Sequence, residues 1–110
     1  MNKIKNGIET KKSQNVAPST EQVRFECHLV ERDVMAGETI MLECETSRPT
    51  PVQWLRDREL LTPDDRIEVC DSGMVHTLMV HEATEEDEAE YMCRIVENNK
   101  STSAIIFVDG

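Results

Sequence analysis

The sequence predicts an all-β protein, on three observations. Apolar and polar residues alternate with a period of two in several short runs, and no stretch has the longer apolar period of a helix. Turn-forming residues separate these runs. The chain of 110 residues has room for one domain. Short strands joined by turns, without helices, indicate all-β architecture.

The N-terminal segment and the first strands differ sharply in pattern. Residues 1–22 are polar, rich in Lys, Asn, Ser and Thr, and show no periodicity. Such a segment is expected to be a flexible arm or linker. The domain is expected to span residues 23–110. Residues 23–29 and 30–35 are expected to form a split first strand, followed by a turn at Ala36 and Gly37.

The middle of the chain continues the alternation. Residues 38–45 form the second expected strand, with Ile40, Leu42 and Cys44 inward. Two prolines make residues 47–51 a loop, because proline cannot donate to a ladder. Residues 52–56 place Trp54 inward, and residues 57–61 form a turn and a short edge strand.

Two hairpins complete the expected strands. The first pairs residues 66–71 with residues 74–81 about Ser72 and Gly73. Its inward side chains are Ile67, Val69, Leu78 and Val80. Residues 82–87 form an acidic corner. The last hairpin pairs residues 91–96 with residues 103–108 and turns at residues 98–100.

The strand near Cys93 has one buried face. Alternation places Ala89, Tyr91 and Cys93 on one side and Glu88, Glu90 and Met92 on the other. A tyrosine two residues before a cysteine is able to close a corner by bonding its hydroxyl to the backbone of residues 82–86. Cys44 lies forty-nine residues before Cys93, and Trp54, the single tryptophan, lies between them.

Four motifs in order give the chain a family resemblance. They are Gly37-Glu-x-Ile-x-Leu-x-Cys44, Trp54, Leu78-x-Val80 and Asp87-x-Ala-x-Tyr-x-Cys93. Over residues 23–109 the chain resembles the intermediate set of immunoglobulin domains. The resemblance implies a two-sheet Greek-key sandwich. It also implies a structural core of Cys44, Trp54, Leu78, Tyr91 and Cys93, and a structural ion pair between Arg66 and Asp87.

The resemblance extends to one group of proteins within that set. The short gap from Cys44 to Trp54 and the stretch Pro-Val-Gln-Trp-Leu-Arg-Asp resemble modules of the giant muscle proteins titin and obscurin. This implies a structural and protein-binding module of a multidomain, cytoplasmic protein of the sarcomere or cytoskeleton. The alternative is an extracellular adhesion or receptor domain with a Cys44–Cys93 disulfide.

The cysteines help to decide between the cytoplasmic module and the extracellular domain. In this fold the strands carrying Cys27 and Cys70 are separated by two others, so these residues lie roughly 14 Å apart, whereas a disulfide needs Cα atoms within about 7 Å. Two spare thiols favour a reducing cytosol. The sequence Asn99-Lys-Ser101 favours the extracellular alternative, because it fits the acceptor pattern for N-glycosylation in an exposed turn.

Charge limits the classes of partner. The net charge is −10, and residues 23–110 alone carry 8 basic and 20 acidic side chains. Such a body repels phosphate, so neither nucleic acid nor an anionic membrane is an expected partner. No apolar stretch approaches the roughly 20 residues of a membrane span. A protein partner is expected, either another sarcomeric immunoglobulin domain or a second copy.

No pattern predicts catalysis, a metal or another cofactor. His28, His76 and His81 are not at ligand spacing, and neither CxxC nor HExxH occurs. The acidic run at residues 82–90 lacks the glycine of a calcium loop. The sequence also lacks a nucleophile elbow and a phosphate-binding glycine loop. We therefore expect a non-catalytic module.

One face is expected to bind the partner. When Trp54, Cys93 and Ile106 point inward, their neighbours on three adjacent strands point outward. These neighbours include Leu55, Met92, Arg94, Ile105 and Phe107. Exposed apolar side chains beside an arginine are typical of interaction surfaces. We expect this face to dock a protein, with strand addition at residues 103–108, unless the arm or an adjacent domain covers it.

Overall fold

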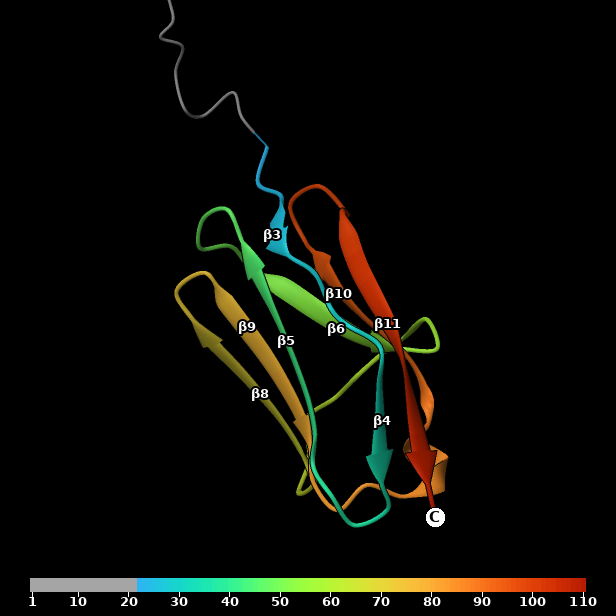
Figure 1. The fold of residues 1–110 in the computed structure, drawn as a ribbon. Helices are drawn as coiled ribbons and strands as arrows, with labels where there is room; N and C mark the ends of the chain where they lie inside the picture. The colour runs from blue at the N-terminus through green and yellow to red at the C-terminus, as the bar shows by residue number, and fades with distance from the viewer. Residues whose placement is uncertain (1–21) are drawn as a thin grey trace, which may run out of the picture.

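The computed structural model describes residues 22–110 as two β-sheets packed face to face (Figure 1). The expected arm, residues 1–22, lies outside the described residues except for Gln22, which is exposed. The strands are short, and the one helical element in this part of the chain is a single 3-10 turn, η2 (Glu85–Asp87). The all-β class predicted from the alternation and the two-sheet sandwich implied by the family resemblance are both confirmed.

The larger sheet has five strands. Its order across the sheet is β4 (Arg32–Met35), β11 (Ser101–Asp109), β10 (Ala89–Ile95), β6 (Val52–Arg56) and β7 (Glu59–Leu60). The smaller sheet has four strands, in the order β3 (Phe25–Cys27), β5 (Ile40–Thr46), β9 (Val75–Val80) and β8 (Ile67–Ser72). In both sheets β-strands distant in sequence lie side by side, as a Greek key requires.

The first strand is split between the sheets, as the sequence predicts. β3 pairs antiparallel with β5, whereas β4 pairs parallel with the C-terminal half of β11. The segment between them crosses from one sheet to the other (Figure 1). Thr102 anchors this crossing, because its Oγ1 accepts a hydrogen bond from the backbone N–H of Leu29.

The core follows from the two-residue period. β5 and β10 alternate between buried and more exposed positions along their whole length, because successive side chains point to opposite faces. The buried set includes Ile40, Leu42, Leu78, Tyr91 and Ile106, each at most 1% exposed. These side chains come from both sheets and fill the space between them.

Val69 departs from the expected burial. It was predicted to lie inward, and its cross-strand partner Leu78 is fully buried. Val69 itself is 38% exposed. β8 is the outermost strand of its sheet in the described part of the chain, so no described strand covers this side. The direction predicted for the side chain is right, but an edge strand leaves it partly open to solvent.

The two hairpin turns also differ slightly from expectation. The first turn is at Gly73 and Met74, one residue later than predicted. Gly73 has a φ of +63°, a conformation that suits glycine. In the last hairpin, β11 begins at Ser101 rather than at residue 103. Asn99 carries the left-handed turn, with a φ of +64°, so the strand starts soon after it.

Candidate functional site

The candidate site is the solvent side of the five-stranded sheet, which we call the outer face. Its side chains alternate with the buried core residues of β10 and β11. β10 and the residue before it contribute Glu88, Glu90, Met92 and Arg94, and β11 contributes Ile105 and Phe107. Ile105 is 41% exposed and Phe107 is 38% exposed. Two large apolar side chains are therefore accessible on this face.

Leu55 corrects one expectation about this face. It was predicted to be a solvent-facing contact residue, but it is only 5% exposed. Leu55 pairs with Met92 on one side and with Leu60 on the other. Because both neighbours are large and point the same way, they cover it. Leu55 thus lies beneath the accessible surface of the outer face.

Leu60 is the apolar residue that the sequence reasoning missed. It is 59% exposed and stands opposite Leu55 on the edge strand β7. The signal that identifies it is the two-residue hairpin turn at Asp57 and Arg58, both of which have positive φ. Such a turn sets the register of β7 on β6 and so places Leu60 beside Leu55.

The register also separates the exposed apolar residues. Ile105 lies opposite Glu90, and Phe107 lies beside Asp33 of β4. Met92 lies opposite Ser103, and its apolar neighbour on β11, Ile105, is diagonal to it. Diagonal residues in an antiparallel pair are within reach of long side chains. The outer face is therefore an apolar band with acidic residues set into it.

Arg94 is held on the outer face by an amide. Its Nη2 donates a hydrogen bond to Oε1 of Gln53 over 2.7 Å. Its Nε is buried and has no hydrogen-bond partner among the described residues. The guanidinium is thus held in position by the hydrogen bond to Gln53.

The edge predicted for strand addition is half closed. β4 pairs with Ile106–Asp109 of β11, so the backbone groups of that half are already used. The remaining half, residues 101–105, has β10 as its pairing strand on the other side. Addition of a partner strand along the whole of residues 103–108 is therefore excluded by β4.

The five predicted core residues lie together in the sandwich. Cys44, Trp54, Leu78, Tyr91 and Cys93 are all buried and belong to one apolar cluster. Cys93 stands opposite Trp54 in the register of β10 and β6. A hydrogen bond with the Cys44 thiol, together with burial, raises the pKa of the Cys93 thiol far above its usual range. The Cys93 sulfur is therefore a protonated, unreactive packing group when reduced.

Tyr91 and Asp87 brace the end of the sandwich. The Tyr91 hydroxyl donates to the backbone oxygen of Asp87 over 2.6 Å. We predicted an acceptor within residues 82–86, so the corner closes one residue later. Arg66 binds both carboxylate oxygens of Asp87, at 3.1 and 3.2 Å. The structure thus brings Arg66 and Asp87 together as a bidentate pair.

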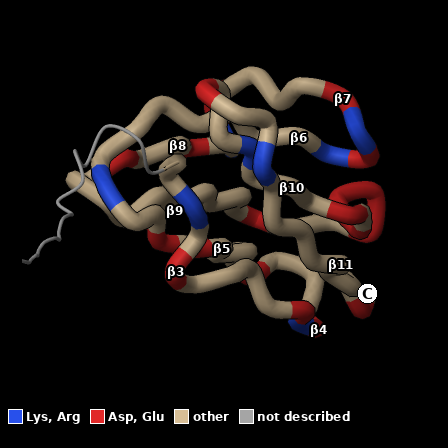
Figure 2. The backbone as a smooth tube through the Cα atoms, turned by 90° about the horizontal axis from the view of Figure 1, so that it is seen from above, with Lys and Arg blue, Asp and Glu red and all other residues tan. Residues whose placement is uncertain are grey.

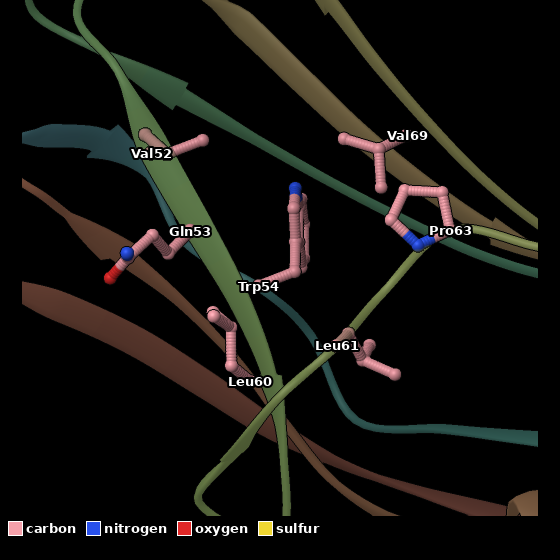
Figure 3. Close-up of a pocket in the computed structure, with 7 residues that line it drawn as sticks. All are labelled: Val52, Gln53, Trp54, Leu60, Leu61, Pro63 and Val69. Carbon is pink, nitrogen blue, oxygen red and sulfur yellow. The ribbon is translucent and has the colours of Figure 1, made fainter.

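A shallow apolar hollow lies beside the core tryptophan. It has a volume of about 210 Å³ and is lined by Val52, Gln53, Trp54, Leu60, Leu61, Pro63 and Val69. Figure 3 shows the Trp54 ring pointing from β6 toward Val69 and Pro63, with Gln53 and Leu60 on the other side of the strand. The lining has no titratable side chain, so it offers no general acid, base or nucleophile.

The histidines do not form a metal centre in the part of the chain that the structure describes. No three His, Cys, Asp or Glu side chains gather there with a geometry that suits a metal ion. His76 is buried and is held by Asp71 at 2.6 Å and by Thr46 at 3.0 Å. It is therefore a satisfied core residue. Within residues 22–110, no helix is long and apolar enough to span a bilayer.

The fold and the candidate site together define a β-sandwich domain whose candidate binding site is the outer face of a sheet. Its residues 23–109 match the family model described as immunoglobulin I-set domain. The chain therefore belongs to the immunoglobulin I-set family.

The chain is similar to several muscle and cytoskeletal proteins. It is 39% identical to mouse palladin in an alignment of 93 residues that covers 79% of this chain and 6% of palladin. It is 33% identical to human slow-type myosin-binding protein C over 64 residues, which are 58% of this chain and 6% of that protein. The chain thus spans a small part of these relatives. Domain I10 of titin has the same fold, with a TM-score of 0.75 and 25% identity over 80% of this chain and 99% of that domain.

The number of free thiols distinguishes a cytoplasmic setting from an extracellular one. In protein alkylated as its native cells are lysed, we expect Cys27 and Cys70 to react in the folded state, because both are exposed. Cys44 and Cys93 should react only after unfolding, which gives four thiols without added reductant. Mass spectrometry of the alkylated chain checks this count. Two thiols after unfolding would indicate a Cys44–Cys93 disulfide and favour the extracellular alternative.

Proposed function

We propose that this chain is a non-catalytic, structural and protein-binding module of a sarcomeric or cytoskeletal muscle protein, in the manner of titin and obscurin. It docks a protein partner through the outer face of its five-stranded sheet. The similarity to palladin, myosin-binding protein C and titin supports the setting. The exposed positions of Cys27 and Cys70 support a reducing, cytoplasmic location.

The observation that carries the docking proposal is the composition of the outer face. In a chain with 31% charged residues, Ile105 and Phe107 remain accessible on the face that also carries Met92 and Arg94. Aromatic residues, Met and Arg are enriched at protein interfaces, and contiguous apolar patches mark them. An arginine that is already ordered loses little side-chain entropy on binding.

A protein partner fits this surface better than other classes do. Figure 2 shows that acidic residues outnumber basic ones along the backbone, which disfavours nucleic acid and anionic lipid. One structure with a similar fold is a complex of titin M10 with an obscurin-like 1 immunoglobulin domain, at a TM-score of 0.73 and 22% identity. That example supports an immunoglobulin domain as the kind of partner.

Phe107→Glu tests the docking surface. The substitution places a charge in the apolar band beside Asp33, so we expect it to abolish partner binding while the thermal midpoint stays within a few degrees. Tagged chains expressed in muscle cells report this through their position relative to the sarcomere and through the proteins that co-purify with them.

Met41→Glu is the matched control. Met41 is 45% exposed on β5, in the other sheet, so its substitution adds the same charge away from the outer face. We expect this variant to keep the wild-type position and partners. If the Phe107 variant behaves like the Met41 variant, the docking site is elsewhere on the domain.

A further inference from the structure

Arg94 is a basic side chain of the outer face, and it has no acidic partner among the residues that the structure describes. The chain holds 22 acidic and 12 basic side chains. Among the described arginines, Arg24, Arg48, Arg56 and Arg66 each form an ion pair, whereas Arg32 and Arg58 form none. Among residues 22–110, Arg94 forms none, and its contact is the Gln53 amide. Its buried Nε also lacks a partner. An unpaired arginine donor is costly once it loses water.

Glu90 is the counterpart of Arg94 on the same strand. Within the described part of the chain its carboxylate forms no ion pair, and its neighbours across the strand are Asp57 and Ile105. Glu90 and Arg94 each lie two residues from Met92 and share its face. Each is therefore roughly 7 Å from Met92 along β10. On β10, Arg94 and Glu90 thus lie on either side of Met92, each two residues from it on the outer face.

We propose that the outer face docks on the outer face of a second copy of this chain, with a two-fold axis that runs across the strands at Met92. This inference rests on the proposed function of that face and names its partner. A two-fold interface uses the same patch on both copies. Rotation about this axis reverses the strand direction, so Arg94 of each copy lies over Glu90 of the other. Both unpaired charges then gain partners.

The spacing of packed sheets is compatible with these pairs. Two sheets pack about 10 Å apart with their strands within about 30° of each other. At roughly 7 Å from the axis, a 30° rotation displaces the opposing residues by only about 3.5 Å, which an arginine side chain spans. The rotation also places β6 and β7 of one copy over the same strands of the other. Leu60 therefore meets its own counterpart, which extends the apolar centre.

A second copy supplies the complementary groups from its own outer face. Any partner must offer an acid opposite Arg94, a base opposite Glu90 and an apolar group between them. The chain has this order in itself. Its net charge of −10 opposes pairing at long range, but salt screens charges beyond about 8 Å at physiological ionic strength. Self-association should therefore be weaker at low salt than at physiological salt.

Charge reversal tests the pairing directly. Sedimentation velocity on the full chain, over a concentration series at physiological salt, should show a wild-type dimer. Arg94→Glu alone and Glu90→Arg alone each oppose like charges at both contacts, so each should weaken dimerisation at least tenfold. An equimolar mixture of the two variants should dimerise again, because each contact then joins one acidic and one basic side chain. The double variant should also recover, and Met41→Glu should behave as wild type.

Two results would overturn the proposal. One is a wild-type chain that stays monomeric up to about 1 mM, where association is worth no more than about 4 kcal/mol. The other is a mixture of the two variants that associates no better than each alone. If self-association fails while Phe107→Glu still abolishes the muscle-cell partners, the outer face docks a different protein and the proposed function stands.

Discussion

Trp54→Ala should lower the free energy of unfolding by about 3–5 kcal/mol, the cost of truncating a large buried aromatic. Trp54 is 3% exposed and lies between the sheets with Cys93 opposite it on β10. The rest of the core is mostly aliphatic, with Tyr91 as its other fully buried aromatic ring. Domains of this size are stable by only about 5–15 kcal/mol. Chemical denaturation should therefore show that the Trp54→Ala variant retains only a small free energy of unfolding.

Two variants calibrate that result. Trp54→Phe keeps most of the ring volume and removes an indole N–H that is buried and has no hydrogen-bond partner within residues 22–110. It should therefore cost less than the alanine change. Leu60→Ala removes a neighbouring apolar side chain that is already exposed, and should cost under about 1 kcal/mol. A midpoint shift of only a few degrees for Trp54→Ala would show that the core does not depend on this ring.

The sequence was a good guide to the core because the strands of this fold have one buried face. The alternation along residues 38–45 and 89–95 gives the direction of every side chain, and the structure buries Cys44, Tyr91 and Cys93 accordingly. An inward side chain on a central strand is then covered by neighbouring strands on both sides. Val69 shows where this reasoning stops, because burial at an edge depends on neighbours that alternation does not describe.

The outer face was less predictable for the same reason. Alternation placed Leu55 on the right side of β6, but its burial depends on Met92 and Leu60, which the register brings beside it. The closure of the β11 edge depends on β4, which reaches it through a crossover between sheets. These cross-strand neighbours depend on how the strands pair in the folded domain. The sequence therefore predicts the direction in which a side chain points but not its accessibility.

Asp87 concentrates several bonds on one buried carboxylate. Arg66 binds both oxygens, and Arg56 lies 3.8 Å away. The backbone N–H of Thr84 donates to Oδ2 over 2.8 Å. Burial acts to raise the pKa of this carboxyl, but the hydrogen bonds from Arg66 and Thr84 outweigh it, and the pKa lies below its ordinary value. The charged form is therefore favoured by folding.

Asp87→Asn keeps the shape of the side chain and removes its charge. We expect it to lower the free energy of unfolding by about 2–3 kcal/mol at pH 7, as for hydrogen bonds to charged groups. The cost stays below that of a fully buried pair, because the Arg66 side chain is 40% exposed and regains water.

The pH dependence of the stability lost in Asp87→Asn shows whether the charge of Asp87 is the cause of that loss. Since folding lowers the pKa of Asp87, its contribution is fully present above the unfolded pKa of about 3.9 and is lost as pH falls through the folded value. Urea titrations of both chains should therefore give a constant stability gap from pH 7 to about 5 and a narrowing gap below about 4. Glu26→Gln, in an exposed pair with Arg24, should cost under about 1 kcal/mol at every pH. A gap for Asp87→Asn that is unchanged at low pH would mean that its charge is not what stabilises this corner.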